Sequence, residues 1–290
     1  MYVARTPVGN LGGRYACGMT GDDLGALYLD LMRKCLTATL EEGPELVEVK
    51  PRDWLRVGIA RALGAAGLKL ARSRADRREA RARGLDNNPR ADTMIGLARL
   101  DNIRMCVERV LADGVPGDLI EAGVWRGGAA VFMRAVLAAH GVRDRTVWVA
   151  DSFAGLPPPD EAAYPADRGD RHHEQEWLAV TLDEVKGTFR KYGLLDGQVR
   201  FLQGWFKDTL PGAPIERLAL IRLDGDMYQS TMDGLAALYP RLSVGGYVIL
   251  DDWNLIPACR RAIDDFRARE GISEPVLPVD GNAGYWRRER

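Results

Sequence analysis

Two acidic clusters in the second half of the chain have the residue types and the spacing of a metal site. Asp224 and Asp226 follow directly after one short apolar run. The adjacent pair Asp251 and Asp252 follows a second such run, one helix length further on. Apolar runs separated in this way are typical of two parallel, buried strands, whose carboxyl ends lie at one edge of the sheet. We expect the four carboxylates to meet there, where they would repel one another unless a divalent cation or a proton held them.

A glycine turn between a predicted strand and a predicted helix indicates a ligand site of another kind. Glu121 and Gly123 end the strand, and Gly127 and Gly128 lead into the helix. Glycines at such a turn let a ligand approach the backbone, and the start of the helix offers unpaired N–H groups. The dinucleotide pattern G-x-G-x-x-G is not met, because position 125 is Trp. An acid before the turn suits the ammonium of an amino acid better than a pyrophosphate, which it would repel.

The residues after the next two predicted strands complete the pattern of a nucleoside pocket. The second strand ends at Asp151, and an acid in this position can accept two hydrogen bonds from a ribose diol. The third strand is followed by Trp205, which can flank a purine; packing in the core is its alternative role, and we prefer that role for Phe206. Each feature alone also occurs as a purely structural one. Together they describe a pocket for S-adenosylmethionine.

The elements that must position these residues alternate along the chain from Thr93 onward. Short apolar runs predict strands, and apolar residues at helical spacing predict helices. The predicted strands are 118–122, 146–150, 199–203, 218–223, 247–250, 275–279 and 284–287; the predicted helices are 22–41, 54–70, 93–112 with Asp92 as its cap, 128–140, 183–192 and 258–270. This alternation indicates an α/β fold with a parallel sheet covered on both faces. A turn at 280–282 predicts a final hairpin that adds an antiparallel edge.

Composition narrows the class of protein. The chain has 290 residues, a net charge of −1 and 46% hydrophobic residues, which suits one large α/β domain with added elements. We expect no membrane partner, because no apolar run is long enough to span a bilayer, and no secretory signal appears at the N-terminus. The four cysteines are scattered, so we expect reduced thiols in a cytoplasmic protein. The near-neutral charge gives no general argument for a nucleic-acid partner.

The segment 69–83 is densely basic, and two interpretations of it are open. It could contact a phosphate or another polyanion, or it could be a solvated segment whose charges are partly offset by Asp76 and Glu79. We favour the solvated segment, because no aromatic residues are interleaved with the basic ones. Residues 1–20 are rich in glycine and lack periodicity, so we expect them to be loosely ordered.

Long stretches of the chain closely resemble one family, the TylF-type macrocin O-methyltransferases. The resemblance covers 24–46 and the chain from Thr93 onward, and it includes EAGVWRGGAA, ADSFAGLPPPD, VRFLQGWFKDTLP, RLDGDMYQSTMDGLAALYPRLSVGGYVILDDW and IPACRRAIDDFR. It implies a class I methyltransferase fold with a mostly parallel, seven-stranded sheet. It also implies two parts, an N-terminal helical extension or lid over 1–92 and a methyltransferase domain over 93–290. The implied activity is methylation of a hydroxyl on a sugar or aromatic ring of a bacterial natural product, with S-adenosylmethionine and Mg²⁺.

The resemblance also implies roles for individual residues. Asp224, Asp251 and Asp252 match the metal-ligand positions. Asp226 lies in the same acidic loop and matches the residue that acts as the base in relatives. Asp226 and Asp224 are therefore the predicted catalytic residues. The segment 170–178, with His172 and His173 as less favoured bases, matches the mobile loop over the acceptor. The predicted cofactor-binding residues are Met94, Glu121, Ala122, Gly123, Asp151, Ser152, Phe153, Gln203, Gly204 and Trp205.

Two other functions are compatible with parts of the pattern. A metal-dependent hydrolase could use the acidic residues without a cofactor, but it would leave the glycine turn and Asp151 without a role. A non-catalytic homologue could keep the fold. If the activity had been lost, however, the acidic residues would be expected to be replaced first, and they are all present. We expect a small-molecule acceptor and a homo-oligomer, either a dimer or a tetramer, since the N-terminal helices would have exposed apolar faces.

Overall fold

A seven-stranded sheet forms the centre of the computed structural model, which describes residues 21–40, 42–48, 54–86 and 88–290. Its strand order is β5-β4-β3-β6-β7-β9-β8. The strands are β3 (Asp118–Ala122), β4 (Val147–Asp151), β5 (Val199–Gln203), β6 (Leu218–Leu223), β7 (Leu242–Leu250), β8 (Leu277–Pro278) and β9 (Gly284–Arg287). The five strands β3 to β7 run parallel to one another, and β9 runs antiparallel to β7 and to β8. The predicted α/β fold with a mostly parallel sheet is confirmed.

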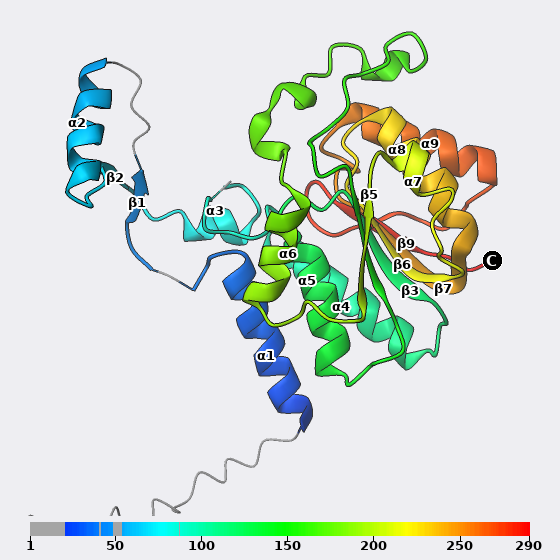
Figure 1. The fold of residues 1–290 in the computed structure, drawn as a ribbon. Helices are drawn as coiled ribbons and strands as arrows, with labels where there is room; N and C mark the ends of the chain where they lie inside the picture. Colours follow the sequence, from blue (N-terminus) through cyan, green and yellow to red (C-terminus); the bar gives the residue numbers. More distant parts are fainter. Residues whose placement is uncertain (1–20, 41, 49–53, 87) are drawn as a thin grey trace, which may run out of the picture.

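Helices cover both faces of the sheet, because its central strands are apolar on both sides (Figure 1). On one face, α4 (Leu97–Ala112), α5 (Gly128–Ala139) and α6 (Leu182–Lys191) share a buried core with alternate residues of the strands. On the other face, α8 (Tyr228–Leu238) and α9 (Pro257–Glu270) form a second core, with the short α7 (Phe206–Thr209) beside them. The segment between β4 and α6 contains only short 3-10 turns, at Pro165–Asp167, His172–Glu174 and Glu176–Leu178.

The strand order positions a ligand crevice at one place in the sheet. From β3 the chain builds outward through β4 and β5, and then it crosses back to place β6 on the other side of β3. Beyond the carboxyl ends of β3 and β6 the connections diverge, which leaves a crevice of the kind that binds ligands in open α/β sheets. The glycine turn follows β3 and the first acidic cluster follows β6, so both reach this crevice.

The N-terminal region has two parts. Helix α1 (Gly21–Leu36) packs on the main body, where Leu29, Met32 and Leu36 join the core that contains α5. The antiparallel pair β1 (Glu45–Glu48) and β2 (Ala71–Arg74), with α2 (Trp54–Ala65), lies apart from the sheet in Figure 1. The division at residue 92 stays a prediction, and α1 shares its core with α4 and α5 of the predicted second part, 93–290. The expectation for 1–20 lies outside the described residues.

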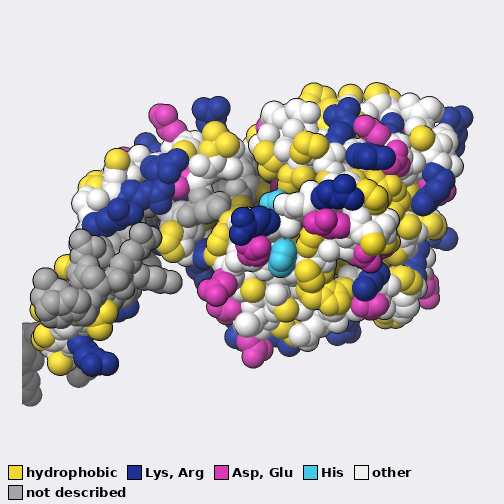
Figure 2. Space-filling view, turned by 90° about the horizontal axis from the view of Figure 1, so that it is seen from above, with side chains coloured by type: hydrophobic (Ala, Val, Ile, Leu, Met, Phe, Trp, Pro, Cys, Tyr) yellow, Lys and Arg dark blue, Asp and Glu magenta, His cyan; other side chains and the backbone are white. Residues whose placement is uncertain are grey.

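The basic segment 69–83 contains β2 and the short helix α3 (Arg78–Ala82). We call the projecting part formed by β1, α2, β2 and α3 the arm, and basic side chains gather on it in Figure 2. Three of them, Arg74, Arg77 and Arg81, converge on the buried carboxylate of Asp86. Part of the basic charge is therefore neutralised within the arm, by Asp86, and the choice between a solvated segment and a polyanion contact stays a prediction.

Several predicted boundaries differ from the observed ones. Helix α4 begins at Leu97 after Gly96, and Asp92 does not cap it, because the Asp92 carboxylate accepts hydrogen bonds from Lys191 and Tyr192 instead. Helices α1 and α2 end earlier than predicted, and β7 begins at Leu242 rather than at 247. The predicted hairpin is confirmed, although β8 is shorter than expected. Within the described ranges, no helix combines the length and the apolar character that crossing a membrane requires.

Candidate active site

The backbones of β3 and β6 come into close contact where the two strands end. Gly123 has a φ of +85°, and a Cβ placed on it would lie 1.8 Å from the carbonyl oxygen of Asp224. Only glycine fits here, because a side chain would meet the backbone of the neighbouring strand and L residues rarely adopt this φ. The contact brings the glycine turn and the first acidic cluster together.

Backbone conformations that are rare for side-chain-bearing residues gather at the same edge. Among the described residues, four non-glycine residues have positive φ values, and three of them, Trp125, Phe153 and Asp226, follow the ends of β3, β4 and β6. Such conformations persist only where the surrounding structure holds them, and they cluster at functional sites. The loops at this edge are therefore built to present particular groups.

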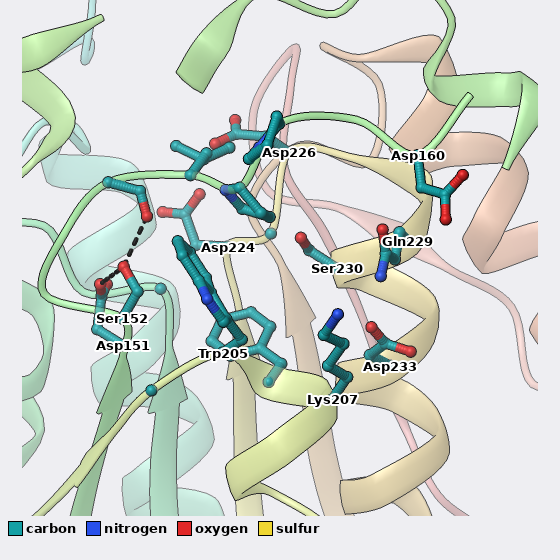
Figure 3. A pocket seen from close by; sticks show the side chains of 18 residues that line it. Asp151, Ser152, Asp160, Trp205, Lys207, Asp224, Asp226, Gln229, Ser230 and Asp233 are labelled. Carbon is teal, nitrogen blue, oxygen red and sulfur yellow. Dashed lines mark hydrogen bonds between the residues drawn. The ribbon is translucent and has the colours of Figure 1, made fainter. Parts of the chain in front are cut away.

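The first of two cavities at this edge has a volume of about 290 Å³ and is shown in Figure 3. It lies beyond the ends of β3, β4, β5 and β6 and reaches the start of α8. Figure 3 shows Asp151 and Ser152 on one side of it, Trp205 and Asp224 near its middle, and Lys207 with Asp233 at the far end. The residues around it include Gly123, Asp151, Ser152, Gly204, Trp205, Phe206, Asp224, Asp226, Gln229 and Ser230.

Asp151 ties the glycine turn to the end of its own strand. Its two carboxylate oxygens accept hydrogen bonds from the backbone N–H of Val124 and of Phe153, each at 2.8 Å. Burial raises the pKa of Asp151, and these backbone hydrogen bonds oppose that effect because they favour the charged form. Each carboxylate oxygen has a second lone pair, so Asp151 keeps the capacity to accept hydrogen bonds from a diol in the cavity.

The second cavity at this edge has a volume of about 460 Å³. It is lined by Met94, Arg99, Glu121, Trp125, His172, Gln175, Trp177, Arg222, Asp251, Asp252, Leu255 and Ile256, among others. Asp224 and Asp226 line both cavities. Two compartments that meet at a pair of acids provide the arrangement for transfer of a group from one bound molecule to another.

Three carboxylates form a tight cluster between the cavities. One oxygen from each of Asp224, Asp226 and Asp252 lies within 4.8 Å of the others. Burial and the neighbouring Asp251 raise the pKa of Asp224 to about 7, against the effect of Arg222, and burial raises the pKa of Asp226 to about 6, against the effect of His172. Burial and Asp224 raise the pKa of Asp252 as well. The cluster thus favours protons or a cation, and its all-oxygen donor set suits Mg²⁺.

Asp251 faces a different set of partners from its neighbour in the chain. One of its oxygens accepts from Arg222, and the other accepts from Arg99 at 2.5 Å. Arg222 also donates to Glu121 at 2.6 Å and to Asp224 at 3.1 Å, and it is only 1% exposed. Buried charges persist when they are paired in this way. In this structure Asp251 is an ion-pair partner of two arginines, while Asp226 joins the cluster beside Asp224 and Asp252.

The predicted cofactor residues divide among the two cavities and their surroundings. Gly123, Asp151, Ser152, Gly204 and Trp205 line the first cavity, and Met94 and Glu121 line the second. Ala122 is buried at the end of β3, Phe153 is buried two residues after Asp151, and Gln203 is exposed at the end of β5. Of the two predicted histidines, His172 lines the second cavity and is bonded to Asp170 at 2.6 Å, whereas His173 is exposed.

The two arginines that bind Asp251 were not among the residues predicted from the sequence. Arg222 is the penultimate residue of an otherwise apolar strand, and a charged residue in a buried strand next to acids is a signal for an ion pair. Arg99 lies in the first turn of α4 and has no such signal, because its partners Asp251 and Asp280 are more than 150 residues away.

The strand order, the glycine turn and the strand-end acid define a class I methyltransferase, the class that takes its methyl group from S-adenosylmethionine. The chain belongs to one family within that class: the family model "Macrocin-O-methyltransferase (TylF)" matches residues 25–288. The activity is therefore O-methyl transfer, and the hydrolase alternative does not hold.

Named relatives and solved structures agree with this assignment. Demethyldecarbamoylnovobiocin O-methyltransferase of Streptomyces niveus is 49% identical over 91% of this chain and 94% of its own length. A tetracenomycin-C 4'-O-methyltransferase of Streptomyces olivaceus, whose substrate carries a 2,3-dimethoxy-α-L-rhamnosyl group, is 51% identical over 92% of this chain and 94% of its own. The structure of the O-methyltransferase NovP is 48% identical, covers 92% of this chain and all of its own, and superposes with a TM-score of 0.79.

Proposed function

We propose that the chain methylates a hydroxyl on a sugar or aromatic group of a bacterial natural product, with S-adenosylmethionine as the methyl donor and a divalent ion in the acidic cluster. The observation that carries this proposal is that Asp224 and Asp226 line both cavities. The similar proteins act on demethyldecarbamoylnovobiocin and on a rhamnosyl tetracenomycin, and a third, 54% identical over 72% of this chain and 84% of its own length, is the mycinamicin III 3''-O-methyltransferase of Micromonospora griseorubida.

The first cavity suits the nucleoside part of the methyl donor. The ribose diol would bond to Asp151, and the purine would lie near Gly204 and Trp205. The methionine end would extend past Gly123 toward Glu121, where Oε2 is buried and has no hydrogen-bond partner among the described residues. A buried, unpaired carboxylate oxygen is costly, and an ammonium group would satisfy it.

The second cavity suits the acceptor in the part away from Glu121, since the methionine end of the cofactor would occupy the part beside Glu121. The acids that line both cavities suit proton transfer. Methyl transfer forms a bond between the acceptor oxygen and the methyl carbon, breaks the methyl–sulfur bond, and leaves S-adenosylhomocysteine and a proton. A divalent ion at the cluster would supply the charge that lowers the pKa of the acceptor hydroxyl. Asp226 faces both cavities and would accept the proton; His172 is the second candidate for that role. The walls of the two cavities would hold the methyl group and the acceptor oxygen in line, and this positioning supplies the remaining rate enhancement.

Asp224 and Asp252 would hold the ion, because they belong both to the set expected from the family resemblance and to the observed cluster. Two residues are candidates for the third carboxylate ligand of the ion. The resemblance favours Asp251, and the observed side-chain arrangement favours Asp226.

Calorimetric titration of S-adenosylhomocysteine tests the cofactor site before the acceptor is known. We expect binding in the micromolar range by the wild type, weakened at least tenfold, about 1.4 kcal/mol, in Asp151→Ala and unchanged in Asp183→Ala, an exposed acid in the first turn of α6. Binding that is insensitive to EDTA would place the cofactor and the metal in separate roles. If the wild type binds no S-adenosylhomocysteine with or without Mg²⁺, the proposal fails.

We also infer that α1 contacts a second copy of the chain. Leu24, Leu27 and Leu31 lie on one side of this helix at helical spacing, and each is more than half exposed. Apolar patches of this kind are typical of association surfaces. Light scattering after size exclusion should show a dimer or tetramer for the wild type and a smaller species for Leu27→Glu. A monomeric wild type would contradict this inference.

A further inference from the structure

Trp125 connects the turn after β3 to the segment 170–178 that borders the second cavity. Its indole Nε1 donates a hydrogen bond to the backbone oxygen of Trp177 at 3.0 Å. The two indole rings also meet edge to face, with 6.4 Å between their centroids and 84° between their planes. Trp125 thus holds the segment by a hydrogen bond and by a ring contact at once.

The conformation of Trp125 indicates that its position matters. Its φ is +47°, which costs a side-chain-bearing residue about 1–2 kcal/mol in general. Its neighbour Arg126 stacks on the Trp125 ring at 4.2 Å and donates hydrogen bonds to the backbone oxygens of Asn88, Pro89 and Ala91. These contacts fix the turn from the N-terminal side, so the direction of the Trp125 ring is defined by its surroundings.

The segment 170–178 has no other hydrogen bond, within the described residues, to a distant part of the chain. The other hydrogen bonds recorded for it within the described residues join positions at most three apart in the chain, such as that between His172 and Asp170. Just before it, the buried Asp167 accepts hydrogen bonds from the backbone N–H of Tyr228 and Gln229, at the start of α8. His172 therefore lies between two anchors, Asp167 on one side and the Trp125–Trp177 contact on the other.

We propose that Trp125 is a positioning residue through which the cofactor turn holds the acceptor segment, so that occupation of the first cavity orders one wall of the second. The proposal rests on the proposed function for the assignment of the two cavities. The physical link is short. Asp151 accepts from the N–H of Val124, the residue next to Trp125, so a ribose bound to Asp151 acts on the same turn that carries the indole. A molecule that steadies this turn also steadies Trp177 and the segment that contains His172.

Hydrogen–deuterium exchange of the unliganded protein tests the anchor itself. Trp125→Phe keeps a ring but removes the indole N–H, so the amides of 170–178 should exchange about 3- to 10-fold faster, the value of one hydrogen bond. Trp148→Phe is the matched control. Trp148 is a buried residue of β4, and its indole Nε1 donates a hydrogen bond of 2.9 Å to Asp118, so the variant also loses one indole hydrogen bond, but away from 170–178. Equal exchange of 170–178 in the two variants and the wild type would overturn the proposal.

The same measurement with saturating S-adenosylhomocysteine tests the coupling. In the wild type and in Trp148→Phe, the ligand should slow exchange in 170–178 by about 3- to 10-fold or more. In Trp125→Phe, the ligand should bind within about threefold of the wild-type affinity and protect the turn around Asp151, but it should leave 170–178 unprotected. Protection of 170–178 in Trp125→Phe equal to that in the wild type would refute the coupling. Failure of the wild type to bind would refute the proposed cofactor site instead, and the unliganded experiment would still decide the role of Trp125.

Discussion

Arg222 and Asp251 form a buried ion pair between the adjacent strands β6 and β7, and Arg99 from α4 binds the second oxygen of the same carboxylate. Asp252, the next residue in the chain, lies in the cluster with Asp224 and Asp226. Two consecutive acids therefore stand in opposite electrostatic surroundings: Asp251 is paired with cations, and Asp252 is crowded by anions. The two should respond differently to the same substitution.

In the absence of metal, Asp251→Asn should destabilise the protein and Asp252→Asn should not. Removing the Asp251 charge leaves Arg222 and Arg99 with a buried charge that has lost a partner, which costs about 3 kcal/mol or more of unfolding free energy. Removing the Asp252 charge relieves repulsion within the cluster. Urea denaturation in EDTA measures both effects. An Asp251→Asn variant as stable as the wild type would contradict the ion-pair role.

Magnesium titration of the same variants then identifies the third ligand. Asp252→Asn should lose the increase in thermal stability that Mg²⁺ gives the wild type, since binding to the folded state raises the melting temperature. If Asp251→Asn keeps that increase, the third place belongs to Asp226. If Asp251→Asn loses it, the ligand set is the one that the resemblance implies, Asp224, Asp251 and Asp252.

Asp226→Asn should lower kcat for methyl transfer by about 10²- to 10⁴-fold, the usual contribution of a general base. The amide keeps the size of the side chain but cannot take a proton from the acceptor. Affinity for S-adenosylhomocysteine, measured by calorimetry, should stay within a few fold. A loss of Mg²⁺ affinity by the same factor as kcat would show that Asp226 acts as a metal ligand rather than as the base.

Gly123→Ala should cost about 3 kcal/mol of unfolding free energy, because the new Cβ would overlap the carbonyl oxygen of Asp224 and the residue would keep a positive φ. Gly141→Ala is the matched control. Gly141 also has a positive φ, +65°, but no atom lies within 4 Å of the place where its Cβ would be. Its cost should be about 1 kcal/mol, so the difference between the variants measures the clash. Equal costs in denaturant titrations would contradict the close contact.

Without metal, the stability of the protein should fall as the pH rises from about 4 to about 7. The folded-state pKa values of Asp224 and Asp226 are raised to about 7 and about 6, mainly by burial, so these two carboxyls bind more protons in the folded protein than in the unfolded chain in this range. The stability that these protons provide is fully present at low pH and is lost as the pH passes through the folded-state values. Each group can contribute a slope of up to about 1.4 kcal/mol per pH unit.

Thermal denaturation in EDTA across this pH range, compared with Asp224→Asn, measures that slope. The variant should show a flatter profile, because it lacks one of the titrating groups. With Mg²⁺ present, the added stability should grow with pH, since metal binding requires deprotonated carboxylates. Stability of the metal-free wild type that rises over this range would contradict the prediction.

Much of the fold was open to prediction because it depends on local patterns. Short apolar runs identified β3 to β6 within a residue of their observed ends, and helical spacing identified α5, α6 and α9 equally well. Helix starts were harder to predict. Asp92 has the residue type of a cap, but Lys191 and Tyr192 from α6 bind its carboxylate, and α4 begins four residues later than predicted. Tertiary partners such as these override a local preference.

The residue pattern was enough to predict a candidate site at the carboxyl edge of a parallel sheet, with a glycine turn, Asp151 and four further acids. Strand ends can be identified from the chain, and parallel strands bring those ends to one edge. Which groups face one another there is visible only in the folded protein. Asp251 faces Arg222 and Arg99, Asp226 lies with Asp224 and Asp252, and Trp125 contacts Trp177. These pairs join elements far apart in sequence. Their partners depend on how α4 and the 170–178 segment pack against the sheet edge, and side-chain packing of that kind leaves no periodic pattern in the chain.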